Sequence, residues 1–219
     1  MGRAAFLATL ATGAAGIFLA PRLAGALSGV RDVIPLPSAV FGDGGWRIYN
    51  VASPLPVFRP ESYSLTVGGL VGRPQTLAWP EVAALAGTEQ VSDFHCVTGW
   101  SVPRVRWEGI RPATLLDLVR PRPTVRYVTF FSLEEPYADQ LSLEQFTQAD
   151  VMLARQMDGR PLTREHGAPL RLVIPRMYGY KGVKWVSAVR FDAEAGLGFW
   201  ERRGYDVNAW VGRSNGIST

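Results

Sequence analysis

The chain has 219 residues, of which 47% are hydrophobic and 19% are charged, and its formal net charge is +4. This balance is typical of a globular protein and argues against a disordered one. The length suits one sizeable domain or at most two small ones, and the sequence contains no internal repeat. The basic residues are scattered rather than gathered in blocks, which argues against a nucleic-acid-binding protein.

Residues 1–26 are predicted to be an export signal, and residues 27–219 the mature domain. An apolar run covers residues 4–20, and Ala24-Gly25-Ala26 matches the small-residue pattern before a signal-peptide cleavage site. The alternative is an uncleaved membrane anchor, because the apolar run is marginal in length for a transmembrane helix.

The start of this segment, Arg3-Ala4-Ala5-Phe6-Leu7, resembles a twin-arginine export signal with Ala4 in the position of the second arginine. That export route carries proteins that are already folded around a cofactor. We therefore expect a periplasmic or other extracytoplasmic location.

The mature chain is predicted to alternate short strands with short helices. Residues 27–60 are rich in Pro and Gly and are expected to be extended. The polar–apolar alternation of residues 64–67 predicts a strand, and Gly68-Gly69 a turn after it. Further helices are expected at 79–85, from 111 onward and at 142–148. The helix that begins at 111 has an apolar face formed by Leu115, Leu116, Leu118 and Val119. Further strands are expected at 90–96, 125–131, 171–174 and 184–191. This mixed order predicts a single α+β domain with mixed sheets and short helices.

Cys96 is the only cysteine in the chain, which excludes an internal disulfide. A lone cysteine can be a small buried hydrophobe, a reactive thiol or a metal ligand. Cys96 follows a predicted strand and precedes a loop with Gly99, a position more typical of a site residue than of a core residue. Its thiolate would be a soft ligand suited to a redox metal.

Two further motifs carry cations next to glycines. In His166-Gly167-Ala168-Pro169-Leu170-Arg171, an imidazole and a guanidinium flank a turn, and Arg offers a planar fork to a phosphate. The alternative for this motif is a plain turn before a strand that carries an incidental surface cation.

The second motif, YGYKGVKW, contains the only two lysines of the chain, Lys181 and Lys184, beside Gly179 and Gly182. Lysines and exposed backbone N–H groups predict an anion site. Neither GxxxxGK[ST] nor GxGxxG occurs, so a nucleotide-binding fold is unsupported. One Cys and two distant His give no zinc-ligand spacing.

CVTGWS, HGAPLRLVIP and YGYKGVKW occur in this order, and together they resemble the sulfite-oxidase-fold molybdopterin enzymes. The resemblance extends over residues 50–191 and is strongest to the bacterial catalytic subunits related to periplasmic protein-methionine-sulfoxide reductase. It implies a single molybdopterin-binding domain in which Cys96 ligates molybdenum. It also implies cofactor contacts by Asn50, Ser132, His166, Arg171, Gly182, Val183 and Lys184. His166 stands where the reductase branch has Asn and where the sulfite-oxidising branch has His.

The resemblance further implies oxygen-atom transfer, with Cys96, Arg104 and Tyr178 as the expected catalytic residues. Arg106 is an alternative to Arg104 for orienting substrate. Arg176 and Trp100 are expected near the mouth of the site or behind it, and plain core packing is the alternative for Trp100.

Sulfite-oxidising relatives carry arginines soon after the ligand cysteine, whereas here Arg104 follows Cys96 by eight residues. We therefore expect reduction of a sulfoxide, such as methionine sulfoxide, with electrons from a membrane haem protein. Sulfite oxidation with a cytochrome acceptor is the alternative reaction, and a binding module that retains the fold is the non-enzymatic alternative. The chain has no room for the second, dimerising domain of many sulfite oxidases, so a monomer is expected.

Overall fold

The computed structural model describes residues 45–213. The chain divides into a unit that ends at Gly45 and a compact unit that begins at Trp46. The expected export signal at residues 1–26 lies outside the described residues. Within residues 45–213, no helix is long and apolar enough to cross a membrane.

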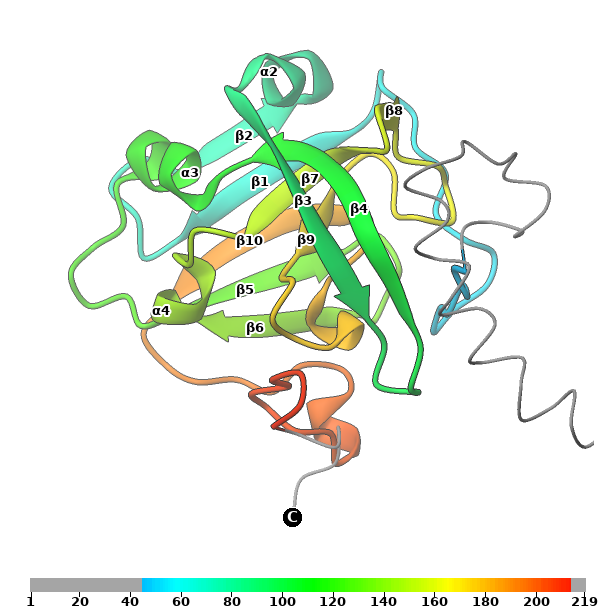
Figure 1. Ribbon diagram of the computed structural model, residues 1–219. Helices are drawn as coiled ribbons and strands as arrows, with labels where there is room; N and C mark the ends of the chain where they lie inside the picture. The colour runs from blue at the N-terminus through cyan, green and yellow to red at the C-terminus, as the bar shows by residue number, and fades with distance from the viewer. Residues whose placement is uncertain (1–44, 214–219) are drawn as a thin grey trace, which may run out of the picture. The chain divides into compact units, whose positions relative to one another are not determined.

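The first sheet has five strands in the order β2-β1-β10-β5-β6 (Figure 1). It is mixed, because β1 and β10 pair in parallel while the other neighbours are antiparallel. Its parallel pair joins segments more than a hundred residues apart in the sequence. The strands are β1 (Ser64–Gly69), β2 (Gln75–Ala78), β5 (Tyr127–Ser132), β6 (Ala138–Ser142) and β10 (Val186–Asp192).

The second sheet is antiparallel and follows the order β3-β4-β7-β8, with β9 also paired to β7. Its longest pair is the β3–β4 hairpin, whose turn contains Cys96. The strands are β3 (Gly87–His95), β4 (Ser101–Ile110), β7 (Met152–Met157), β8 (Arg160–Pro161) and β9 (Arg171–Val173).

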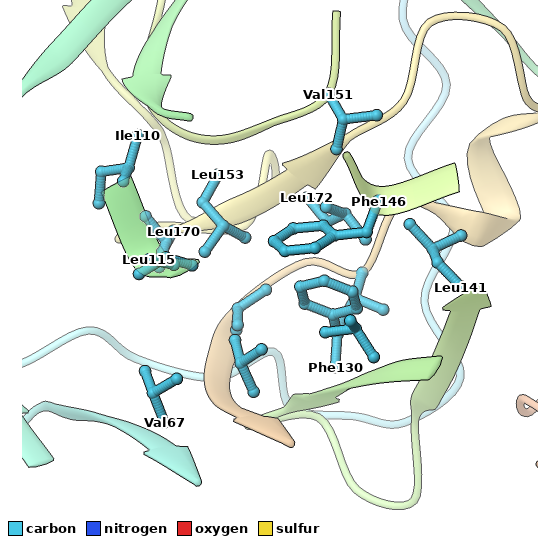
Figure 2. Close-up of a cluster of buried hydrophobic side chains, with 14 of the residues drawn as sticks. Val67, Ile110, Leu115, Phe130, Leu141, Phe146, Val151, Leu153, Leu170 and Leu172 are labelled. Carbon is cyan, nitrogen blue, oxygen red and sulfur yellow. The ribbon is translucent and has the colours of Figure 1, made fainter. Parts of the chain in front are cut away.

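The two sheets share one hydrophobic core. Strand β1 alternates exposed and buried side chains, which directs Leu65 and Val67 into this core. Phe130 of β5 and Leu153 of β7 belong to the same cluster, so the core joins both sheets. Figure 2 shows Phe130 and Leu153 in this cluster, with Phe146 between them and Val67 at its edge. Both sheets are therefore fixed by the same buried apolar surface.

The helices are short. They are α2 (Trp79–Ala84), α3 (Pro112–Val119), α4 (Leu143–Phe146) and the 3-10 turns η2 (Gly179–Lys181) and η3 (Glu201–Arg203). In α4, the Ser142 Oγ accepts a hydrogen bond from Gln145 N at 3.1 Å, and the Gln145 side chain accepts one from Ser142 N at 2.8 Å. This capping box explains why so short a helix begins at a definite residue.

The expected mixed sheets and short helices are confirmed, and each expected strand and helix is present with small shifts at its ends. The predicted turn at Gly68-Gly69 is wrong, because β1 continues through both glycines and pairs with β10. Gly69 has φ +86°, and a Cβ there would lie 2.4 Å from the Phe191 carbonyl oxygen. These glycines therefore permit close pairing at the end of a strand. Strands β2, β4, β6, β7 and β8 were not expected.

Lys181 lies in a fully buried cluster with Asp139 and Glu201. Its Nζ donates to Asp139 Oδ1 at 2.5 Å, to Glu201 Oε1 at 2.7 Å and to the Gln140 carbonyl at 2.9 Å. The other oxygen of each carboxyl, Asp139 Oδ2 and Glu201 Oε2, has no hydrogen-bond partner among the described residues. The expectation that Lys181 helps to bind an external anion is therefore wrong, because two internal carboxyls already surround its charge. The cluster fastens η3 to β6 and η2.

Burial raises the pKa of Asp139 to about 7, against the opposing effect of Lys181. The folded protein therefore binds this proton more tightly than the unfolded chain, so stability is lost as pH rises from about 4 to about 7. We expect Asp139→Asn to remove this loss, since an amide does not titrate in this range. Urea unfolding at several pH values should show a flatter pH dependence in Asp139→Asn than in the wild type.

The control is Asp117→Asn, because the Asp117 side chain is 78% exposed and makes only a surface ion pair with Arg120. This control should keep the wild-type pH dependence. Equal pH dependence in wild type and Asp139→Asn would contradict the raised pKa.

Candidate functional site

A cavity of about 350 Å³ lies where β3 and β5 end and where β9 and β10 begin. Its walls come from six separate parts of the chain and include eight aromatic side chains. The lining includes Trp46, Tyr49, Phe94, Cys96, Trp100, Glu134, Tyr137, His166, Arg171, Tyr180, Gly182, Lys184, Trp200 and Tyr205. The three sequence motifs thus meet at one place although they are far apart along the chain.

Cys96 is held in the tight turn of the β3–β4 hairpin. Its backbone N–H donates to the Trp100 carbonyl at 2.9 Å, and its carbonyl accepts from Gly99 N at 3.1 Å. Gly99 has φ +88°, a conformation that favours glycine. The thiol is half-buried, lines the cavity and lies 3.2 Å from the Thr98 hydroxyl. This placement favours a ligand or reactive thiol over a simple core residue.

Arg171 is a buried cation in the cavity wall. The guanidinium is packed among three aromatic rings, those of Trp46, Phe94 and Trp107, at 5.9, 5.6 and 5.2 Å from their centroids. Its Nη1 donates to the His166 carbonyl at 3.3 Å, while Nε has no hydrogen-bond partner among the described residues. Burial lowers the pKa of Arg171 to about 10. In the described part of the chain, no carboxylate forms an ion pair with it. An anion bound in the cavity would therefore compensate its buried charge.

Lys184 provides a second cation to the cavity. Its Nζ donates to the backbone carbonyls of Tyr49 at 2.8 Å and Glu165 at 3.3 Å. Burial, and then the charge of Arg171, lower the pKa of Lys184 to about 8. Gly167 allows the HGAP turn to pack on this lysine, because a Cβ there would lie 2.7 Å from the Lys184 Cβ. Two cations thus lie together with no carboxylate paired to either among residues 45–213.

Of three other expected cofactor-binding residues, Asn50 and Gly182 line the cavity and Val183 does not. Asn50 lines the cavity at its rim, and its side-chain amide donates to the Ala52 carbonyl at 2.7 Å. Gly182 lines the cavity, where a Cβ would approach the Leu172 carbonyl to 2.9 Å. The Val183 side chain is fully buried in the main core and lies outside the cavity lining.

Ser132 also lies outside the lining. Its hydroxyl donates to the Lys184 carbonyl and accepts from Glu134 N, both at 2.8 Å. Ser132 therefore connects the end of β5 to the lysine loop.

Arg104 and Tyr178, expected to be catalytic, do not line the cavity. Arg104 is exposed with φ +54° at the irregularity in the β3–β4 pairing, and its backbone N–H donates to Asp93 Oδ1 at 2.8 Å. Tyr178 packs against the main core. Arg106 is exposed and absent from the lining, and Arg176 forms a 3.0 Å ion pair with Asp150. None of the four therefore contributes to the wall that contains Cys96.

Several lining residues carried no signal in the sequence. Trp46 and Tyr49 come from an irregular segment, while Trp200 and Tyr205 flank η3 near the C-terminal end of the described residues. Glu134 follows β5 and is 4% exposed. Aromatic residues are common in any core, so only their convergence on the cavity distinguishes them.

A family model described as "Oxidoreductase molybdopterin binding domain" matches residues 52–200. The chain is 38% identical over 145 residues to an uncharacterized oxidoreductase of Bacillus subtilis (strain 168), covering 66% of this chain and 73% of that protein. The chain belongs to the family of molybdopterin-binding oxidoreductase domains, as its motifs predict.

Two named relatives represent different reactions. The sulfite oxidase of Arabidopsis thaliana is 30% identical over 70% of this chain, and the protein-methionine-sulfoxide reductase catalytic subunit of Ralstonia nicotianae is 30% identical over 61%. The chain spans only 48% and 44% of these two proteins. The crystal structure of the sulfane dehydrogenase SoxCD from Paracoccus pantotrophus superposes with a TM-score of 0.62 at 21% identity, covering 69% of this chain and 43% of that one. This match confirms the sulfite-oxidase fold.

The described residues fit a molybdopterin. A half-buried thiol and two cations without paired carboxylates line one cavity, which are the groups needed by a metal and by a phosphate. No cluster of three or more His, Cys, Asp or Glu placed to hold a metal ion occurs among residues 45–213. Among residues 45–213, Cys96 supplies the only thiol in this lining.

Inorganic phosphate should raise the melting temperature of the cofactor-free protein, because it supplies a counter-ion to Arg171 and Lys184. The gain should be roughly 2–4 °C for each kcal/mol of binding free energy. Since the pKa of Lys184 is about 8, its contribution is present below that pH and is lost above it. Calorimetry with and without phosphate across this pH range measures the effect.

Lys184→Met should reduce the phosphate effect and remove its pH dependence near 8. Arg73→Met is the matched control, because Arg73 is exposed and lies outside the cavity lining. Identical responses in the two variants would show that phosphate binds elsewhere.

Proposed function

We propose that this chain is an extracytoplasmic molybdenum-pterin oxidoreductase that reduces a sulfoxide, such as methionine sulfoxide, by oxygen-atom transfer. The observation that carries the proposal is the presence of the Cys96 thiol and the buried Arg171 guanidinium in the wall of one cavity. Electrons would come from a membrane haem protein, and export would follow the twin-arginine route predicted for residues 1–26. The chain would act as a monomer.

The residues divide into two groups. Cys96 would ligate the metal, while Arg171, His166 and Lys184 would hold the phosphate region of the pterin, with Asn50 and Gly182 against the same group. Ser132 would act indirectly, because its hydroxyl holds the Lys184 carbonyl. When bound, the cofactor supplies a metal centre that accepts or releases an oxygen atom with a change of two electrons.

The remaining lining suits an uncharged substrate. Trp100, Tyr137, Trp200 and Tyr205 present aromatic surface to the cavity, and the turn that follows Cys96 carries no cation up to Trp100. A sulfoxide is neutral and has apolar groups on sulfur, so these rings can bury it. The reduction consumes two protons and two electrons per sulfoxide and releases one thioether and one water.

Sulfite oxidation is the second candidate reaction. The observation that favours it is His166, which the sequence resemblance associates with the sulfite-oxidising branch, together with the similarity to a plant sulfite oxidase. Sulfite is a small dianion and would need cations at the reacting centre. In the lining, Arg171 and Lys184 are committed to the proposed phosphate region, and the only other cation is the exposed Arg47.

Cys96→Ser should lower activity by roughly 100-fold or more, because a hard hydroxyl replaces the soft thiolate ligand. Molybdenum and pterin analysis of the purified protein should accompany the assay. Wild-type protein without molybdenum, together with an unchanged Cys96→Ser variant, would contradict the proposed function.

The two reactions are separated by paired assays on the same preparation. Methionine sulfoxide with a reduced dye tests the reductase, and sulfite with ferricyanide tests the oxidase. Turnover is expected with methionine sulfoxide. Turnover with sulfite alone would overturn the reductase proposal and leave the family assignment intact.

A further inference from the structure

One continuous wall of the cavity is an irregular segment at the start of the compact unit. Residues 46–51 all line the cavity, and none of them belongs to a helix or strand. We name residues 46–52 the N-terminal strap. Because no sheet hydrogen bonds hold the strap, its position must depend on side-chain contacts from the body of the domain.

The strongest of these contacts comes from Glu134. Its Oε1 accepts hydrogen bonds from two successive backbone amides, Val51 N at 2.7 Å and Ala52 N at 3.0 Å. Glu134 is 4% exposed, and the charge of Lys184 acts on it without a direct ion pair among the described residues. A buried carboxylate is costly to desolvate, and these two amide bonds compensate part of that cost.

The strap is held at two further points. Lys184 Nζ donates to the Tyr49 carbonyl at 2.8 Å, and the Trp46 ring lies against His166 and Phe94 with centroids 4.8 and 4.7 Å away. The strap therefore contacts the same Lys184, and the same His166, that the proposed function assigns to the pterin.

Ser132 links these contacts. It accepts from Glu134 N and donates to the Lys184 carbonyl, each at 2.8 Å. The end of β5, the lysine loop and the strap are thereby joined through one hydrogen-bonded network.

We propose that Glu134 is a positioning residue that latches the N-terminal strap over the molybdopterin, so that the strap retains the cofactor in its cavity. The inference rests on the proposed placement of the cofactor between the strap and the Arg171–Lys184 pair. A wall held mainly by side-chain hydrogen bonds can open when they break. Cofactor release is therefore controlled by the strap, and the latch sets its rate.

The test compares holoenzyme of the wild type, Glu134→Ala and Glu134→Gln. Two readouts are used: hydrogen–deuterium exchange of a peptide covering residues 46–52, and the rate at which molybdenum and pterin leave the protein on dilution. Glu134→Ala should exchange and release about tenfold faster or more, because two charge-assisted hydrogen bonds are lost. Glu134→Gln keeps a carbonyl acceptor and should fall between the two, and it preserves the test if the alanine variant does not fold.

Glu135→Gln is the matched control, since it makes the same chemical change at the exposed neighbouring residue. It should behave as the wild type in both readouts. Wild-type exchange and release in both Glu134 variants would overturn the latch while leaving the proposed function intact. Wild-type protein that carries no molybdenum would instead overturn the proposed function.

Discussion

Two buried cations, Lys181 and Arg171, differ in how the surrounding residues compensate their charge, and this difference distinguishes the core from the cavity. Lys181 is enclosed by Asp139 and Glu201, and its three donors all find acceptors within the chain. Arg171 is equally buried but has aromatic rings and one carbonyl around it instead of a carboxylate. A buried unpaired cation is costly; the charge of Lys181 is compensated inside the chain, whereas an anion in the cavity would compensate that of Arg171. The same chain thus pairs one buried cation internally and leaves another open to a ligand, which is the role the proposed function gives to Arg171.

The fold brings the binding groups together by placing loops from both sheets at one location. Cys96 lies in the hairpin turn after β3, Arg171 begins β9, and Lys184 precedes β10. The β1–β10 and β4–β7 pairings join distant segments, and the core between the sheets fixes them relative to one another (Figures 1 and 2). A rigid β scaffold with loop-borne ligands can hold a cofactor in a defined orientation.

Segments outside the sheets complete the cavity. The strap supplies Trp46 and Tyr49, and the region around η3 supplies Trp200 and Tyr205. Each is fastened by a buried acid, Glu134 for the strap and Glu201 for η3. The two interactions differ, because Glu201 accepts a hydrogen bond from the Lys181 ammonium whereas Glu134 accepts hydrogen bonds from backbone amides. Aromatic walls on irregular segments also give the cavity its apolar character, which favours a neutral substrate in the proposed function.

The sequence by itself determined the family, the α+β class and the residues at the centre of the site, because CVTGWS, HGAPLR and YGYKGVKW keep their order and chemistry in one dimension. It could not assign Lys181 and Lys184 to different roles, since both are lysines in one motif and only the fold places carboxyls around Lys181. It also placed Arg104 and Tyr178 at the site, whereas the structure leaves both outside the cavity lining. No sequence motif marked Glu134 or the aromatic lining residues as part of the site. Only tertiary structure decided these points, because burial and partnership depend on residues that are remote in the chain.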